Sequence, residues 1–100
     1  MTSKQRAFLI KLSHTLQANC QIGKAGLVEG NLQQLDAMLD KTELVKANVL
    51  PTFDTDLRDL ANEIAKDIKA EVVIVIGRKI VFYRHSKELA KKGKALVLPR

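Results

Sequence analysis

The chain has 100 residues, enough for one domain built around a single hydrophobic core. Hydrophobic residues make up 46% and charged residues 28%, as in ordinary globular chains and unlike disordered ones, and the net charge is +6. No apolar run approaches the roughly 20 residues of a membrane-spanning helix, and no apolar signal segment opens the chain, so we expect a cytoplasmic protein without a membrane partner.

A first helix is expected at the N-terminus, where Thr2 and Gln5 stand at the spacing of a capping box. Apolar side chains at helical spacing then form one stripe: Phe8, Leu9, Leu12 and Leu16. The opposite side is basic and contains no acid: Lys4, Lys11 and His14, with Arg6 at the flank. Solvated helix backs usually mix charges of both signs, so we interpret this face as a functional basic surface, with a plain solvated face as the alternative.

Residues 18–22 alternate in polarity and predict a short first strand, in which Cys20 is interpreted as a small buried hydrophobe. The loop Gly23-Lys24-Ala25-Gly26 follows, between this strand and the next helix. Its two glycines permit positive φ angles and a close approach of another backbone. Unpaired N–H groups at the start of the helix, with the charge of Lys24, would complete a site for a phosphate-sized anion. A simple turn is the alternative.

A second helix is expected over residues 28–39, with Gly30 inside it or in a loosely wound first turn. Residues 43–50 predict a second strand that Pro51 ends, with Lys46 on the side away from Val45 and Val49. For Lys46, a surface lysine and an RNA contact remain equal alternatives. A third helix is expected over residues 57–68, with a broad buried stripe and a solvated charged face.

A β-branched run over residues 72–76 predicts a third strand, covered on much of both sides. Gly77-Arg78 fits a two-residue hairpin turn, and residues 79–84 form the returning strand. The basic tail, residues 86–100, is expected to be a loop followed by a short extended segment.

The predicted order is α-β-α-β-α-β-β in a single domain, residues 1–100. The two β-α-β crossovers should be parallel and right-handed, which places the second and third helices on one face of the sheet. The closing hairpin is antiparallel. We therefore expect an α+β fold (an α/β two-layer arrangement) with a four-stranded mixed sheet.

Charge is distributed unevenly along the chain. Residues 1–28 carry four basic side chains and no acid, residues 29–75 carry five basic and ten acidic ones, and residues 76–100 carry eight basic ones against Glu88 alone. Basic ends with an acidic middle suggest one face for a polyanion and an opposite face for solvent.

Several short motifs, in this order and spacing, resemble the CRM domain (chloroplast RNA splicing and ribosome maturation) in its stand-alone bacterial form, the YhbY family. The motifs are His14, Ile22-Gly23-Lys24-Ala25-Gly26-Leu27, residues 36–39, Glu43-Leu44-Val45-Lys46, Ile76-Gly77, Tyr83-Arg84 and Leu98-Pro99-Arg100. They span nearly the whole chain. Ala18 departs from the family, which often has proline shortly before the first strand.

The resemblance implies a sheet like that of the C-terminal domain of translation initiation factor three, with the fourth strand between the second and third. It also implies binding to ribosomal RNA of large-subunit precursors, with the glycine loop as a principal contact, in ribosome assembly or maturation. Contacts with ribosomal proteins would be possible in that setting. The expected RNA-contact residues are Lys4, Arg6, Lys11, His14, Gly23, Lys24, Ala25, Gly26, Lys46, Arg78, Lys79 and Arg84.

Catalysis finds little support, because no nucleophile has an obvious base and no carboxylate pair or metal-ligand spacing stands out. We expect no enzyme activity, no cofactor and no metal. The aromatics are few, namely Phe8, Phe53, Phe82 and Tyr83, and at least two belong to the core, with Tyr83 either buried or exposed. Recognition should therefore rest on RNA backbone and shape. The alternatives are a phosphate or mononucleotide site at the loop and a protein-docking adaptor that uses the acidic helical face.

Overall fold

The computed structural model describes residues 1–16, 18, 20–22, 29–50, 56–93 and 95–98. Four helices lie within these ranges: α1 (Ser3–Ser13), α2 (Glu29–Thr42), α3 (Leu57–Ile68) and α4 (Lys87–Lys91). The four strands are β1 (Cys20–Ile22), β2 (Leu44–Val49), β3 (Glu71–Ile76) and β4 (Lys79–Tyr83). None of the helices in these ranges has both the length and the apolar character needed to cross a membrane.

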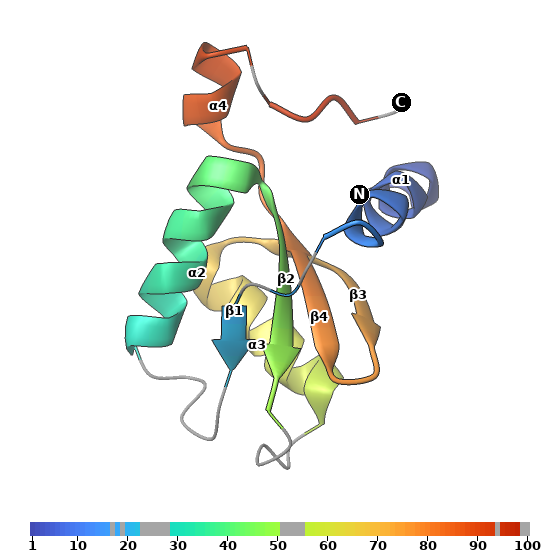
Figure 1. The fold of residues 1–100 in the computed structure, drawn as a ribbon, viewed down its shortest axis with the longest axis vertical. Helices are drawn as coiled ribbons and strands as arrows, with labels where there is room; N and C mark the ends of the chain where they lie inside the picture. The colour runs from blue at the N-terminus through green and yellow to red at the C-terminus, as the bar shows by residue number, and fades with distance from the viewer. Residues whose placement is uncertain (17, 19, 23–28, 51–55, 94, 99–100) are drawn as a thin grey trace.

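The strands form one mixed sheet in the order β1-β2-β4-β3, which Figure 1 shows with β4 between β2 and β3. β1 pairs with β2 in parallel, and β4 pairs antiparallel with both of its neighbours. This arrangement confirms the expected mixed sheet, including the position of the fourth strand that the family resemblance implied. β1 and β3 are consequently the two edges of the sheet.

The main core lies between the sheet and the pair α2 and α3, as the crossover argument predicted. Leu35 and Leu39 of α2 and Leu60 and Ile64 of α3 are buried there against the strands. Five side chains of α3 are buried: Leu60, Ala61, Ile64, Ala65 and Ile68. Their spacing matches one face of a helix, which explains how the sequence pattern identified this element.

A second, smaller core occupies the opposite face of the sheet, where α1 packs. Leu9 is fully buried against Leu44, Val73 and Val81. Leu96 of the C-terminal segment packs against the same cluster. The helix thus adds a partial third layer to the two that were expected (Figure 1).

This second core decides the position of Tyr83. Phe82 and Tyr83 point to opposite faces of β4, and both are buried, because α2 and α3 cover one face and α1 covers part of the other. Tyr83 retains only 7% exposure. Of the two alternatives for Tyr83, the buried one is correct. The Tyr83 ring therefore offers no platform for stacking a base.

Local signals explain where several elements begin. Thr2 and Gln5 form the predicted capping box, with Gln5 N donating to Thr2 Oγ1 at 3.1 Å. The side chain of Asp56 caps α3 by accepting hydrogen bonds from the backbone N–H groups of Arg58 and Asp59. Gly77 adopts φ +57° in the β3–β4 hairpin, a conformation that glycine tolerates well.

Three features differ from the sequence prediction. Leu16 was expected on the apolar stripe of the first helix, but α1 ends at Ser13 and Leu16 lies beyond it, exposed. The tail was expected to start as a loop, but it contains α4, because the Ser86 side chain caps it by accepting from Leu89 N at 3.2 Å. β3 contains a register irregularity between Val72 and Ile74, so that Val73 and Ile74 both pack toward α1 while Val72 and Val75 pack toward the main core.

Candidate nucleic-acid interface

The glycine loop links β1, which ends at Ile22, to α2, which begins at Glu29. Gly23, Lys24, Ala25 and Gly26 lie outside the described residues, so their role in RNA contact stays a prediction. Gly30 stands in the first turn of α2, which agrees with one of the two expected positions.

The basic back of α1 is exposed. Lys4, Lys11 and His14 are all exposed, and no side-chain hydrogen bond or ion pair joins Lys4 or Lys11 to another described residue. The first turn of α1 holds no acid. These two lysines are therefore cations available to an external anion, on a helix whose other side is anchored by Leu9.

Arg6 lies on the same helix but is held by the sheet. Its Nη1 atom donates to the carbonyl of Val72 at 2.9 Å and to that of Val73 at 2.6 Å. These hydrogen bonds fix α1 to the irregular part of β3. Arg6 is thus turned away from the Lys4 and Lys11 face, and part of its donor capacity is used within the protein.

Lys46 and Arg78 also donate to backbone carbonyls. Lys46 Nζ lies 3.3 Å from the carbonyl of Ser13 at the end of α1, which also accepts from Leu16 N, and the helix dipole favours a cation at this end. Arg78 donates to Val49 through Nε at 3.1 Å and to Leu50 through Nη2 at 2.7 Å, which ties the hairpin to the end of β2. Lys79, its neighbour, is exposed.

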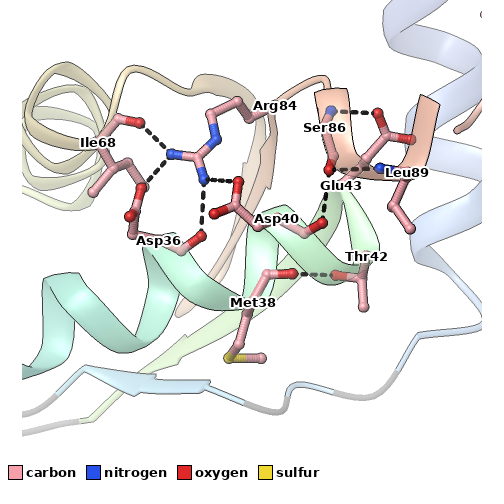
Figure 2. A network of polar contacts seen from close by, with 9 residues as sticks. All are labelled: Asp36, Met38, Asp40, Thr42, Glu43, Ile68, Arg84, Ser86 and Leu89. Carbon is pink, nitrogen blue, oxygen red and sulfur yellow. Dashed lines mark hydrogen bonds and ion pairs between the residues drawn. The ribbon is translucent and has the colours of Figure 1, made fainter. Parts of the chain in front are cut away.

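Arg84 is held by several acceptors of the protein (Figure 2). Its guanidinium forms ion pairs with Asp36 and Asp40 and donates to the carbonyls of Ile68, at 2.7 Å, and of Asp36, at 2.8 Å. Burial alone would lower the pKa of Arg84, but Asp36 and Asp40 outweigh it and raise the pKa above its usual value. The group therefore clamps α2, α3 and β4 together.

Glu43 organises the C-terminal side of the same region. Its carboxylate is fully buried, at 0% exposure, and accepts from Ser86 N at 2.7 Å and from Leu96 N at 2.6 Å. His85 Nδ1 lies 3.2 Å from the same carboxylate. Figure 2 shows Glu43 beside Ser86 and Leu89 at the start of α4. This contact holds the basic tail against the body of the domain.

From the sequence, all these basic residues were expected RNA contacts, whereas the structure separates those without a bond inside the protein from those that form one. Lys4, Lys11, His14 and Lys79 are exposed and have no side-chain bond to a described residue. Arg6, which is also exposed, and the less exposed Lys46, Arg78 and Arg84 bond to backbone or carboxylate groups of the protein. α4 adds exposed cations that the sequence had placed in a loop: Lys87, Lys91 and Lys92, the last paired with Glu88 at 3.6 Å. Within the described ranges, no three side chains of the His, Cys, Asp or Glu type are placed to hold a metal ion.

Residues 1–84 match the model of the CRS1/YhbY (CRM) domain. This match covers most of the chain. The chain belongs to the CRS1/YhbY family. The family expected from the short motifs is thereby confirmed.

Curated relatives agree with this assignment. "Probable RNA-binding protein YqeI" of Bacillus subtilis is 35% identical over 88 residues, which cover 88% of this chain and 92% of the relative. A Haemophilus influenzae protein named "RNA-binding protein" is 34% identical over 88 residues, covering 88% of this chain and 89% of that one.

A solved structure shares the fold of this CRS1/YhbY protein. The solution structure of a Staphylococcus aureus protein, described as a candidate RNA-binding protein, superimposes with a TM-score of 0.80 at 37% sequence identity. The superposition covers 99% of each chain. The α+β architecture is therefore shared along the whole length of both proteins.

Proposed function

We propose that this CRS1/YhbY protein binds RNA without catalysis, and that its target is ribosomal RNA of large-subunit precursors in the cytoplasm. In this proposal it acts as an assembly or maturation factor. Its named relatives are described as RNA-binding proteins, which supports the class of ligand. The ribosomal target and the assembly role rest on the family resemblance.

The observation that carries the proposal is the acid-free, exposed back of α1. Lys4 and Lys11 project from a helix that is anchored to the sheet through Leu9, and neither lysine is neutralised by a described residue. Exposed cations on a rigid helix suit a phosphate backbone, because their attraction requires no base-specific contact.

The glycine loop and Lys79 complete the proposed contact surface. The loop follows the edge strand β1, and Lys79 lies at the start of β4, beside Ile76 of β3. The described aromatics support recognition of backbone and shape: Phe8 is half-buried, and Phe82 and Tyr83 are buried. A stacking mode would need exposed rings.

Sedimentation of a cell lysate tests the proposal. We expect the protein to migrate with large-subunit precursors in a sucrose gradient, and to move to the free fraction after limited nuclease digestion. Crosslinking with ultraviolet light before lysis should recover large-subunit ribosomal RNA attached to the protein. Cosedimentation that survives complete nuclease digestion would instead favour a protein-docking adaptor. Migration with free proteins in every gradient would contradict the proposal.

A further inference from the structure

A pocket at the β3 edge of the sheet is lined by donor side chains from both faces. It is formed by Arg6 of α1, by Arg58 and Asn62 of α3 and by residues 72–75 of β3, and its volume is about 360 Å³. β3 pairs only with β4, so this side of the strand is a sheet edge. α1 and α3 lie on opposite faces of the sheet, and the pocket is placed where both helices reach the edge.

The chemistry of the lining favours an anion. Two guanidinium groups and one carboxamide contribute to the pocket, and none of its lining residues is acidic. Arg6 uses Nη1 on the Val72 and Val73 carbonyls, so those acceptors are already occupied. Its remaining N–H groups make no hydrogen bond to a described residue. They are donors of the type that recognises phosphate in two-pronged geometry.

Arg58 and Asn62 have side chains that form no hydrogen bond or ion pair with a described residue. They are four residues apart, and hence neighbours on one face of α3. Both are exposed. The exposed surface of that helix mixes charges, with Asp59, Glu63 and Asp67 beside Arg58 and Lys66, and of these five only Arg58 lines the pocket.

We propose that the Arg6–Arg58–Asn62 pocket binds a phosphodiester group of the RNA backbone. This inference rests on the proposed RNA-binding function and adds a contact at the sheet edge opposite β1 and the loop that follows it. The two edges are separated by three strand spacings, or about 14 Å. A bound RNA would then extend from the loop side of the sheet, past α1, to the β3 edge, and the footprint would be larger than the loop alone allows.

Filter binding of deproteinised large-subunit ribosomal RNA tests the pocket. We expect Arg58→Ala combined with Asn62→Ala to weaken binding by about 3- to 10-fold at low salt and to reduce the salt slope by about one, as loss of one phosphate contact requires. Arg58→Lys, which keeps the charge without the planar fork, should give an intermediate loss. Lys66→Ala is the matched control, because it removes an exposed cation from the same helix outside the pocket.

A second measurement separates binding from folding. Because Arg58 and Asn62 are exposed, circular dichroism melts of the variants should match that of the parent. In a heteronuclear NMR titration with a short RNA hairpin, the side-chain amide of Asn62 should shift. If the double variant and Lys66→Ala bind the ribosomal RNA equally, this pocket is not a contact, even though the Lys4 and Lys11 surface can still be one. If the parent protein binds no RNA, both the proposed function and this inference fail.

Discussion

The carboxylate of Glu43 accepts a hydrogen bond from the backbone N–H of Leu96, 53 residues further along the chain, at a distance of 2.6 Å. Ser86 N bonds to the other oxygen of the same carboxylate at 2.7 Å. A buried carboxylate is tolerated when such donors surround it. Glu43 therefore ties the last described segment of the chain to the junction of α2 and β2, in addition to the packing of Leu96 against the second core.

Replacing Glu43 by Gln should destabilise the protein by about 1–3 kcal/mol, because an amide N–H₂ would face one of the two backbone donors. Urea unfolding measures the loss, and amide exchange of Ser86 and Leu96 should accelerate. Glu88→Gln is the control, since Glu88 is exposed and its one ion pair with a described residue is to Lys92, and it should cost about 0.5 kcal/mol or less. Equal losses for the two variants would contradict the role given to Glu43.

Tyr83 should make stability fall at alkaline pH. Burial raises the pKa of its hydroxyl above the usual 10.0, and the carboxylates of Glu43 and Glu71 raise it further. The unfolded chain then loses this proton before the folded protein does. The stabilisation is complete below about pH 10 and is lost as the pH rises through the folded-state pKa.

The measurement is the free energy of unfolding of the parent and of Tyr83→Phe as a function of pH. Above about pH 10, the free energy of unfolding of the parent should fall relative to that of Tyr83→Phe. Tyr83 is the single tyrosine in the chain, so phenolate absorbance reports its titration directly. A midpoint at or below that of free tyrosine would show that the ring is not buried as described.

The basic back of α1 should contribute to RNA binding and little to stability. Replacing Lys4 and Lys11 together by Ala removes two exposed charges, so the salt slope of RNA affinity should fall by about two and affinity by roughly tenfold at low salt. The melting temperature should change little, because neither side chain belongs to either core. Unchanged affinity in the double variant would remove this helix face from the interface.

Variants of the glycine loop separate charge from backbone geometry. Lys24→Ala removes one charge and should lower the salt slope by about one. Gly26→Val should cost more affinity if this glycine takes a positive φ or touches a phosphate, and a strained turn can also destabilise the protein by about 1–3 kcal/mol. Circular dichroism must accompany the binding assay. A folded Gly26→Val protein with full affinity would mean that the loop is a turn and not a contact.

Short-range signals account for the parts of the fold that could be predicted from the sequence. The Thr2–Gln5 capping box, the buried stripe of α3 and the Gly77-Arg78 turn each depend on residues a few positions apart. The position of β4 could not be derived this way, because pairing of distant strands leaves no local pattern, and the family resemblance supplied it.

Local sequence patterns could not show which basic residues bond within the protein either, because those contacts also join residues far apart in the chain. Arg6 bonds to carbonyls 66 and 67 residues away, and Arg84 bonds to Asp36 across 48 residues. In the sequence these arginines have the same appearance as the free lysines of α1. Their contacts exist only after α1 has packed on β3 and Arg84 has reached α2, so tertiary structure alone shows which donor groups of a basic side chain are used within the protein.

The salt dependence of RNA affinity tests the central claim most directly. Affinity of the parent protein for deproteinised large-subunit ribosomal RNA would be measured by filter binding at several salt concentrations from dilute to physiological buffer. With roughly four to six phosphates contacted, the logarithm of affinity should fall with the logarithm of salt concentration at a slope of about −3 to −5. Competing duplex DNA should bind more weakly, because the protein is expected to recognise A-form shape or the 2′-hydroxyl. An affinity that does not change with salt would contradict a phosphate-binding basic surface.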